Sequence, residues 1–385
     1  MKILIINFEY PPLGGGGGVA TKQLAETLAK RHDVHVITTG YEGLKDKEVL
    51  NDVSVHRVRV VGRTSLPTAS LVSLITFVPA ALFRGWRLSK QTRFDVINAQ
   101  FVVPSGLPAS ILAYWTGVPF VLSFIGGDLF DPSKGVSPHR HWWLRWLIRL
   151  ISAKAEVCTA ISEDTKKRAQ EIHGVKKPIV VTHIGLLPPQ VTPAGWSVLD
   201  LPRGMPLFVS IGRLIPRKSY ETLLAVWQEI PEAHLAIVGS GPMANDLKNK
   251  ITSLGLAGRV HMMGYLEEEP KQQLLRVAQG YVSASEHEGF GIVFLEAMEA
   301  GLPIVATNRG GQRDFLQEGE NALLVPVGDV GKFKASVERL LQDSELRARM
   351  SSNNKEKVKE FYLGKTAKKF EEVLIRAVRD YEDSN

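Results

Sequence analysis

Cysteine is almost absent from this sequence, because Cys158 is the one cysteine among 385 residues and no internal disulfide can form. It lies in the apolar run 155–161, where a plain buried thiol is expected rather than a catalytic one. Long apolar runs are scarce as well. The longest, residues 69–83, contains Pro79 and ends at Arg84, so it is shorter than the roughly 20 residues that a membrane-spanning helix needs. We therefore expect no transmembrane helix.

The first residues also lack the marks of a secretory signal. Residues 1–6 run directly into a β-rich segment, and no small-residue cleavage site follows them. We therefore expect a cytoplasmic protein, with a peripheral position at the inner face of the membrane left open.

Acidic residues are under-represented in the first half of the chain. Up to Gln190 there are 23 Lys and Arg against 14 Asp and Glu, which leaves 24 against 26 for the remainder. The first half thus carries a net charge of about +9 and the second about −2. This asymmetry predicts that the first half faces something anionic. The sequence has no nucleic-acid-binding signature, so we expect a membrane surface or an anionic acceptor and no nucleic acid.

Short β-branched runs alternate with amphipathic stretches along the whole chain. This alternation is typical of an α/β fold, in which crossover helices connect the strands of a parallel sheet. Strands are predicted at 2–7, 33–38, 53–60, 94–99, 119–124, 156–160 and 178–182 in the first half, and at 207–211, 234–238, 259–262, 280–284, 303–306 and 323–325 in the second.

A segment rich in Pro and Gly, residues 185–204, separates the two sets of strands and is the predicted linker. The length of the chain also favours two domains. We place them at 1–190 and 200–364. Because open parallel sheets bind ligands at the carboxyl ends of their strands, the cleft between the domains is the expected site.

The first motif is a run of five glycines, residues 14–18, between the first predicted strand and a helix. Such a loop presents bare backbone N–H groups to an anion. Five glycines cost considerable backbone entropy, which argues against a merely flexible turn. A dinucleotide fingerprint fits poorly, because the second strand ends in Thr38-Thr39 without an acidic residue for a ribose. An NAD-dependent dehydrogenase is therefore a distant alternative.

The second motif, residues 210–218, combines Gly212 with the cations Arg213 and Lys218 at a strand end. A planar guanidinium beside a point charge suits a diphosphate. Cations at the start of a helix oppose the helix dipole, and a bound anion would explain their position. The alternative is a pair of solvated surface residues.

The third motif, residues 285–298, is the most specific. Glu288 follows a strand, and Glu296 lies just over one turn inside a helix that starts near Ile292. The segment 289–291 leaves amides at that helix start for phosphate or sugar oxygens, while carboxylates accept hydrogen bonds from hydroxyls. Alternatively, Glu288 could interact favourably with the helix dipole, and Glu296 could face solvent. The apolar neighbours of Glu296, however, predict that its carboxylate needs a partner.

Together these motifs resemble the retaining glycosyltransferases of family 4, which have the GT-B fold of two Rossmann-like domains facing across a cleft. The resemblance covers nearly the whole chain and also rests on residues 238–242 and on Gly310-Gly311 with Asp314. It implies a metal-independent hexosyltransferase whose first domain binds the acceptor. The second domain would bind a nucleotide-diphosphate sugar, with no further cofactor, and a helix at 365–385 would pack back on the first domain.

The resemblance also implies roles for individual residues. Arg213 and Lys218 would bind the diphosphate, Glu296 the ribose and Glu288 the transferred sugar. The catalytic set is Glu288, Arg213, Lys218 and Asp128. The donor-binding set is Gly15, Gly16, Gly17, Gly212, Arg213, Lys218, Gly239, Gly241, Tyr265, Glu288, Phe290, Gly291, Ile292 and Glu296, and the acceptor-binding set is Asn98, Gln100 and Asp128.

Two histidines that are common in this family are missing. Residues 98–100 read Asn-Ala-Gln where relatives have His-x-His, and Ile125 stands where many have a histidine. In an internal-return transfer the leaving phosphate can take the acceptor proton, so Asn98, Gln100 and Asp128 need only orient hydroxyls. Because the imidazoles are missing, an inactive protein that binds a nucleotide sugar is an alternative. An epimerase or phosphorylase is another alternative, because such enzymes share the same fold.

Residues 139–150 combine tryptophans with arginines at helical spacing. This composition suits a membrane interface, and the alternative is a helix whose indoles pack under the fold. We expect the acceptor to be a glycan, a lipid-linked sugar or a small molecule.

Overall fold

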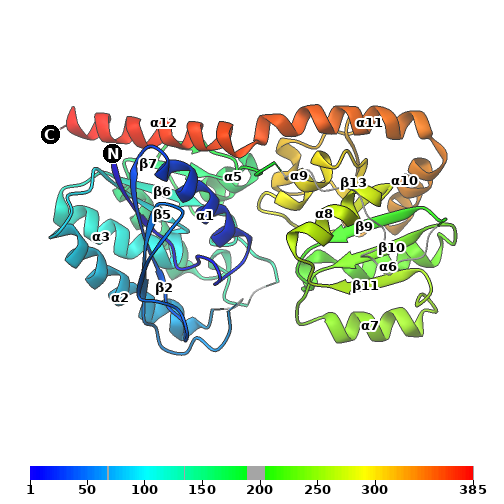
Figure 1. Cartoon of the computed structure of the whole chain (residues 1–385), viewed down its shortest axis with the longest axis horizontal. Helices are drawn as coiled ribbons and strands as arrows, with labels where there is room; N and C mark the ends of the chain where they lie inside the picture. The colour runs from blue at the N-terminus through cyan, green and yellow to red at the C-terminus, as the bar shows by residue number, and fades with distance from the viewer. Residues whose placement is uncertain (67–68, 134, 189–203, 385) are drawn as a thin grey trace. The chain divides into compact units, whose positions relative to one another are not determined.

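The computed structural model describes residues 1–66, 69–133, 135–188 and 204–384 (Figure 1). The chain divides into two compact units. The first comprises Met1–Leu187 with Leu363–Asn385, and the second comprises Pro188–Tyr362. The domains were predicted at 1–190 and 200–364. Most of the predicted linker, residues 189–203, lies outside the described residues.

The first unit is built on an eight-stranded sheet in the order β3-β4-β2-β1-β5-β6-β7-β8, in which β3 runs antiparallel to β4 and the other neighbours are parallel. Strands β1 to β4 form one half of the sheet, and strands β5 to β8 form the other half. The strand order reverses between β1 and β5, so the topological switch point lies between these two strands. The strands are β1 Lys2–Ile6, β2 Asp33–Thr39, β3 Lys47–Leu50, β4 Val53–Val58, β5 Val96–Gln100, β6 Phe120–Phe124, β7 Val157–Ala160 and β8 Ile179–Val181.

Helices cover both faces of this sheet, which explains its nearly continuous apolar strands. One core cluster joins the sheet to α1 and α12, and a second joins it to α2, α3, α4 and α5. The side chains of Ser70 and Ser162 cap α2 and α5, where they accept hydrogen bonds from the amides of Ser73 and Thr165. The bounds are α1 Gly16–Ala29, α2 Leu71–Ser89, α3 Leu107–Thr116, α4 Trp142–Lys154, α5 Glu163–Glu171 and α12 Leu363–Glu382.

A buried carboxylate attaches the carboxy-terminal helix α12 to the turn that follows α1. Glu371 accepts from Arg31, and its Oε1 lies 2.6 Å from Nε2 of His32. The apolar side chains Phe370, Leu374 and others of α12 lie in the same core cluster as Leu28 of α1. The last helix is therefore an integral part of the first unit.

The second unit has a fully parallel six-stranded sheet in the order β11-β10-β9-β12-β13-β14. Its switch point lies between β9 and β12. The strands are β9 Leu207–Ile211, β10 His234–Val238, β11 Val260–Gly264, β12 Gly280–Ser283, β13 Ile304–Thr307 and β14 Ala322–Val325. The helices are α6 Tyr220–Gln228, α7 Ala244–Ser253, α8 Glu268–Val277, α9 Ile292–Glu299, α10 Val330–Gln342 and α11 Ser344–Lys357.

Helix α2 differs from the expectation drawn from the apolar run 69–83. The helix continues to Ser89, and by length and composition alone it would qualify as a membrane span. However, its Phe77, Ala81 and Leu88 side chains are buried in the core of the first unit. The inner side of α2 is thus already occupied by the sheet.

Candidate functional site

A buried carboxylate lies between two cations at the switch point of the second sheet. Glu288, in the loop after β12, places Oε1 2.5 Å from Nζ of Lys218 in the loop after β9. Ser285 Oγ donates to the same oxygen at 2.7 Å. Arg217 Nη1 lies 3.5 Å from Oε2. Lys218 and Glu288 were predicted site residues, whereas Arg217 was not assigned a role.

Glu288 is ionised at neutral pH. Burial raises the pKa of its carboxyl group, but Lys218 and Arg217 outweigh burial and, with the hydrogen bond from Ser285, lower the pKa to about 2. The residue is only 5% exposed. It is therefore a fixed negative charge whose hydrogen-bonding geometry is set in advance.

Helix α9 begins directly after this loop, so its positive end adjoins Glu288. Its N-cap is Gly291, whose φ of 92° is a left-handed conformation that favours glycine. Within the described residues no side chain caps this end, and helix N-termini of this kind bind anions. The ring of Phe290 is buried against Phe315 at a centroid distance of 5.2 Å, so only its backbone can serve the predicted donor contact.

The second glutamate of the motif, Glu296, pairs with Lys271 of α8. Lys271 Nζ lies 2.9 Å from Glu296 Oε1 and 2.8 Å from Glu268 Oε2. Burial raises the pKa of Glu296, although Lys271 opposes that effect. Its other oxygen, Oε2, is buried and has no hydrogen-bond partner among the residues described. A buried acceptor without a donor is costly, so this oxygen is suited to a ligand hydroxyl.

Glycines let the loops after β9 and β10 pack closely together. Gly239 has a φ of 141°, and a Cβ there would lie 1.9 Å from the carbonyl oxygen of Gly212. A Cβ at Gly241 would lie 2.4 Å from the carbonyl oxygen of Leu214. These contacts explain the glycines by packing, and their donor contacts stay predictions.

Two of the predicted donor residues are at the surface. Tyr265, directly after β11, is 70% exposed. The side chain of Arg213 is also exposed, and in the described ranges it makes no hydrogen bond or ion pair. Arg213 is thus available for an anion, in contrast to the paired Lys218.

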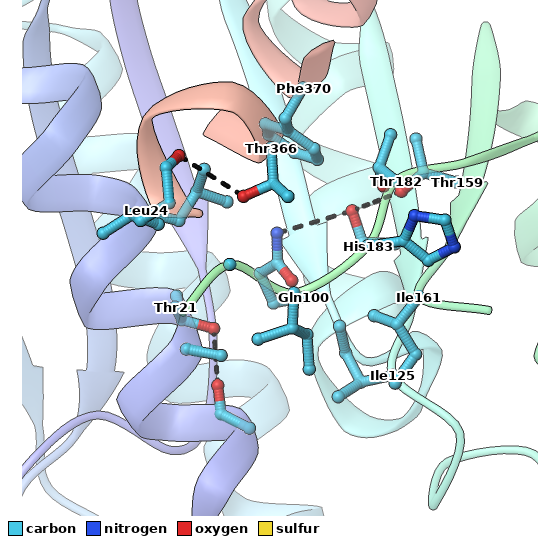
Figure 2. A pocket seen from close by; sticks show the side chains of 16 residues that line it. Thr21, Leu24, Gln100, Ile125, Thr159, Ile161, Thr182, His183, Thr366 and Phe370 are labelled. Atoms are coloured by element: carbon cyan, nitrogen blue, oxygen red, sulfur yellow. Dashed lines mark hydrogen bonds between the residues drawn. The ribbon is translucent and has the colours of Figure 1, made fainter. Parts of the chain in front are cut away.

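Of the predicted acceptor residues, Gln100 at the carboxyl end of β5 lines a small cavity of about 40 Å³, whereas Asn98 and Asp128 do not line it. Figure 2 shows Gln100 among the lining side chains, which include Thr21, Thr182 and His183. Gln100 Nε2 donates to Asn98 Oδ1 at 2.8 Å. Asn98 is fully buried, so it can act on an acceptor only by orienting Gln100.

Asp128 is directed at the backbone rather than at open space. Its Oδ2 accepts from the Val102 amide at 2.7 Å and its Oδ1 from the Ile125 amide at 3.0 Å. Burial raises its pKa to about 6, although these hydrogen bonds oppose the rise. In this structure Asp128 fixes the loops after β5 and β6.

The glycine-rich loop of the first unit opens α1. A Cβ at Gly15 or Gly16 would meet no described atom within 4 Å, whereas one at Gly17 would lie 2.5 Å from the ring of Phe101. The Gly15 amide donates to Glu9 Oε2 at 3.2 Å. The chain's own carboxylate therefore already uses one of the amides where an anion is predicted.

Each unit thus presents polar groups at the switch point of its sheet. In the second, an ionised carboxylate, two cations and a helix start can bind phosphate and sugar hydroxyls. In the first, amides and hydroxyls can orient an acceptor. Within residues 1–66, 69–133, 135–188 and 204–384, no group of three or more His, Cys, Asp or Glu side chains could hold a metal ion.

Known proteins match both units. The family model described as "Glycosyl transferases group 1" matches residues 197–357, and the model described as "Glycosyl transferase 4-like domain" matches residues 15–185. An uncharacterised glycosyltransferase of Methanocaldococcus jannaschii is 29% identical over 94% of either chain. The UDP-Gal:alpha-D-GlcNAc-diphosphoundecaprenol alpha-1,3-galactosyltransferase of Escherichia coli is 27% identical over 98% of either chain.

Solved structures give the same fold. Sucrose-phosphate synthase from Thermosynechococcus elongatus is similar with a TM-score of 0.84, at 20% identity over 98% of both chains. HepE of Anabaena, in complex with UDP, is similar with a TM-score of 0.78, at 20% identity over 98% of this chain and 100% of that one.

Proposed function

The chain belongs to the group 1 glycosyltransferases and has the GT-B fold, and we propose that it transfers a hexose-type sugar from a UDP-sugar with retention of configuration. The observation that carries the proposal is the ionised, buried Glu288 held between Lys218 and Arg217 at the switch point of the second sheet. Support for uridine comes from the UDP-Gal named for the E. coli relative and from the UDP complex of the Anabaena protein.

In this proposal the second unit supplies most of the contacts to the donor. The diphosphate contacts Arg213, Lys218 and the first amides of α9, and these groups stabilise the charge that develops as the diphosphate leaves. Glu288 accepts hydrogen bonds from the sugar, and Glu296 Oε2 accepts one from a ribose hydroxyl. The chain's own cations carry this role, so the proposal includes no metal ion and no cofactor besides the nucleotide sugar.

The first unit binds the acceptor, with Gln100 orienting a hydroxyl. The departing phosphate oxygen takes the proton of that hydroxyl, so the reaction needs no imidazole near residues 98–100. We propose a glycan, lipid-linked or small-molecule acceptor, a place in cell-envelope or polysaccharide biosynthesis, and a cytoplasmic location. The lipid-linked acceptor named for the E. coli relative supports a lipid-linked acceptor.

The donor is tested by thermal denaturation with UDP-glucose, UDP-galactose, UDP-N-acetylglucosamine, GDP-mannose, ADP-glucose and NAD. We expect the UDP-sugars to raise the melting temperature, because a ligand that binds only the folded state stabilises it by mass action. Arg213→Ala should weaken donor binding by roughly tenfold, since one charge-assisted contact is lost. Arg349→Ala, which removes an exposed arginine of α11, is the matched control and should bind as the wild type does.

Product analysis separates the alternatives. Proton NMR of the product should show the anomeric configuration of the donor, and an inverted product would refute retention. A UDP-sugar that binds but is never transferred to any acceptor would favour an inactive binding protein. A stabilising effect of NAD alone would overturn the donor assignment.

A further inference from the structure

Most tryptophans of this chain are exposed, and they lie on three helices of the first unit. Five of the seven belong to α2, α3 and α4. Burying an indole in the protein is favourable, so the exposure of so many requires an explanation. The exposed fractions are 39% for Trp86, 57% for Trp115, 78% for Trp142, 48% for Trp143 and 55% for Trp146.

These helices form one layer on one face of the sheet. Helix α3 packs against both α2 and α4, and Figure 1 shows α2 and α3 side by side. Phe77 of α2, Leu112 of α3 and Ile148 of α4 belong to the same buried cluster. Their inner sides are therefore committed to the core, and the outer side of the layer carries the tryptophans. We call this outer side the aromatic layer.

Other apolar side chains extend the aromatic layer. Leu71, Ile75 and Phe83 of α2 are more than half exposed, and Tyr114 of α3 is 82% exposed. Between α2 and α3 an open groove of about 470 Å³ is lined by Pro79, Leu82, Phe83, Trp86 and Trp115. Apolar patches of this extent mark interaction surfaces on soluble domains.

The charge of the layer is entirely positive. Helices α2, α3 and α4 contain no Asp or Glu, whereas α2 carries Arg84 and Arg87 and α4 carries Arg145 and Arg149. Lys90, directly after α2, places Nζ 3.7 Å from the ring centroid of Trp86. Aromatic side chains interleaved with cations match the interface of a bilayer with anionic headgroups.

We propose that the aromatic layer docks this protein on an anionic lipid bilayer. The tryptophans lie among the headgroups and upper acyl chains, and the arginines and Lys90 contact lipid phosphates. Helix α2 lies along the surface rather than crossing it, because its inner side is part of the core. The absence of Asp and Glu from α2, α3 and α4 favours this anionic surface over a protein partner. The inference does not rest on the proposed sugar transfer.

The test is binding of the full chain to vesicles. Vesicles of phosphatidylcholine with 30% phosphatidylglycerol should sediment the protein at low salt, and pure phosphatidylcholine vesicles should bind it at least tenfold more weakly. Tryptophan fluorescence should shift to shorter wavelength on binding, and brominated lipids should quench it, because five of the seven indoles enter the interface. Binding should weaken as the salt concentration rises, since exposed charges are screened.

Two variants and a matched control locate the surface. Arg87→Glu with Lys90→Glu should lower the partition coefficient by roughly tenfold or more. Trp142→Ser with Trp146→Ser should also lower it and should reduce the fluorescence quenching, because two of the five exposed indoles are removed. The control, Lys368→Glu with Lys369→Glu, reverses two exposed lysines of α12, which covers the other face of the sheet, and should bind as the wild type does. Thermal denaturation checks that every variant is folded.

Unchanged vesicle binding in both layer variants would overturn the proposal, as would equal loss in the α12 control. Absence of binding to anionic vesicles would also overturn it while leaving the donor assignment untouched, because donor binding is measured without lipid. If the wild-type chain does not bind vesicles but forms dimers, and the tryptophan variant is monomeric, the aromatic layer binds a second copy of the chain instead.

Discussion

Glu288→Gln is expected to lower the rate of sugar transfer by roughly 10³-fold, because a preorganised charge at the reacting sugar is lost. The carboxylate is held by Lys218, Arg217 and Ser285 before any ligand arrives. An amide of nearly the same shape can accept hydrogen bonds on one atom only and carries no charge. Initial rates with radiolabelled UDP-sugar and the identified acceptor measure this loss.

The matched control is Glu286→Gln, two residues away in the same loop. Glu286 is exposed, and its carboxylate is 3.4 Å from Ser219 Oγ, so its replacement should leave the rate within about twofold, as is usual for surface positions. Equal rates in Glu288→Gln and the wild type would remove Glu288 from the mechanism. Equal losses in the two variants would point to a loop that has moved.

Acid unfolding gives an independent check on the same side chain. The pKa of Glu288 is lowered from 4.5 to about 2 in the folded state, so its contribution is present above pH 4.5 and is lost as the pH falls toward 2. By linkage that contribution is roughly 3 kcal/mol at neutral pH. The difference in the free energy of unfolding between the wild type and Glu288→Gln should shrink steadily below pH 4.5.

The strands that carry the site could be predicted because both of their faces are buried. The strand 234–238 was predicted with the limits that the structure shows, and every residue in it is buried. The edge strand β3 was missed because Lys47–Leu50 is half exposed and pairs only with β4. The dipeptide Asn51-Asp52 was the local sequence signal, because Asn and Asp tolerate the positive φ that a two-residue hairpin turn requires. Both residues have positive φ in the structure.

The position of the site, where the ends of strands meet, could be predicted from the sequence. The pairs that its side chains form could not. The ends of β9 and β12 flank the switch point, so the approach of Lys218 to Glu288 follows from topology. The sequence cannot give the direction of a side chain, and it did not show that Arg217 also reaches Glu288. Asp128 looked like a loop carboxylate free for substrate, whereas its oxygens hold two backbone amides.

Lys271, the partner of Glu296, is the residue of the candidate site that sequence reasoning missed most completely. It lies 25 positions before Glu296, on a helix with three charged neighbours at its start, where it resembles an ordinary surface lysine. The apolar neighbours of Glu296 did predict that this carboxylate needs a partner. Which cation supplies it depends on how α8 packs beside α9, and that packing is a tertiary property.

Lys271→Met is expected to weaken UDP binding by about 30-fold and to destabilise the second unit by roughly 3 kcal/mol, because the buried carboxyl group of Glu296 loses the cation that pairs with it. Burial already raises the pKa of Glu296, and loss of the Lys271 cation raises it further. The protonated acid is a weaker acceptor for ribose hydroxyls than the carboxylate. Affinity in the variant should therefore increase with rising pH more steeply than in the wild type, and calorimetric titration with UDP over a range of pH measures both.

The double variant Lys271→Met with Glu296→Gln separates binding from folding. A neutral amide at residue 296 removes the buried charge, so most of the stability should return, while UDP affinity stays low and becomes independent of pH. Lys250→Met is the matched control, since it breaks an exposed ion pair of 3.0 Å with Glu221 that is worth at most about 1 kcal/mol. A Lys271→Met variant that binds UDP with wild-type affinity at every pH would show that Glu296 does not contact the nucleotide. Low affinity that is the same at every pH would mean that Lys271 itself, rather than the ionisation of Glu296, holds the ligand.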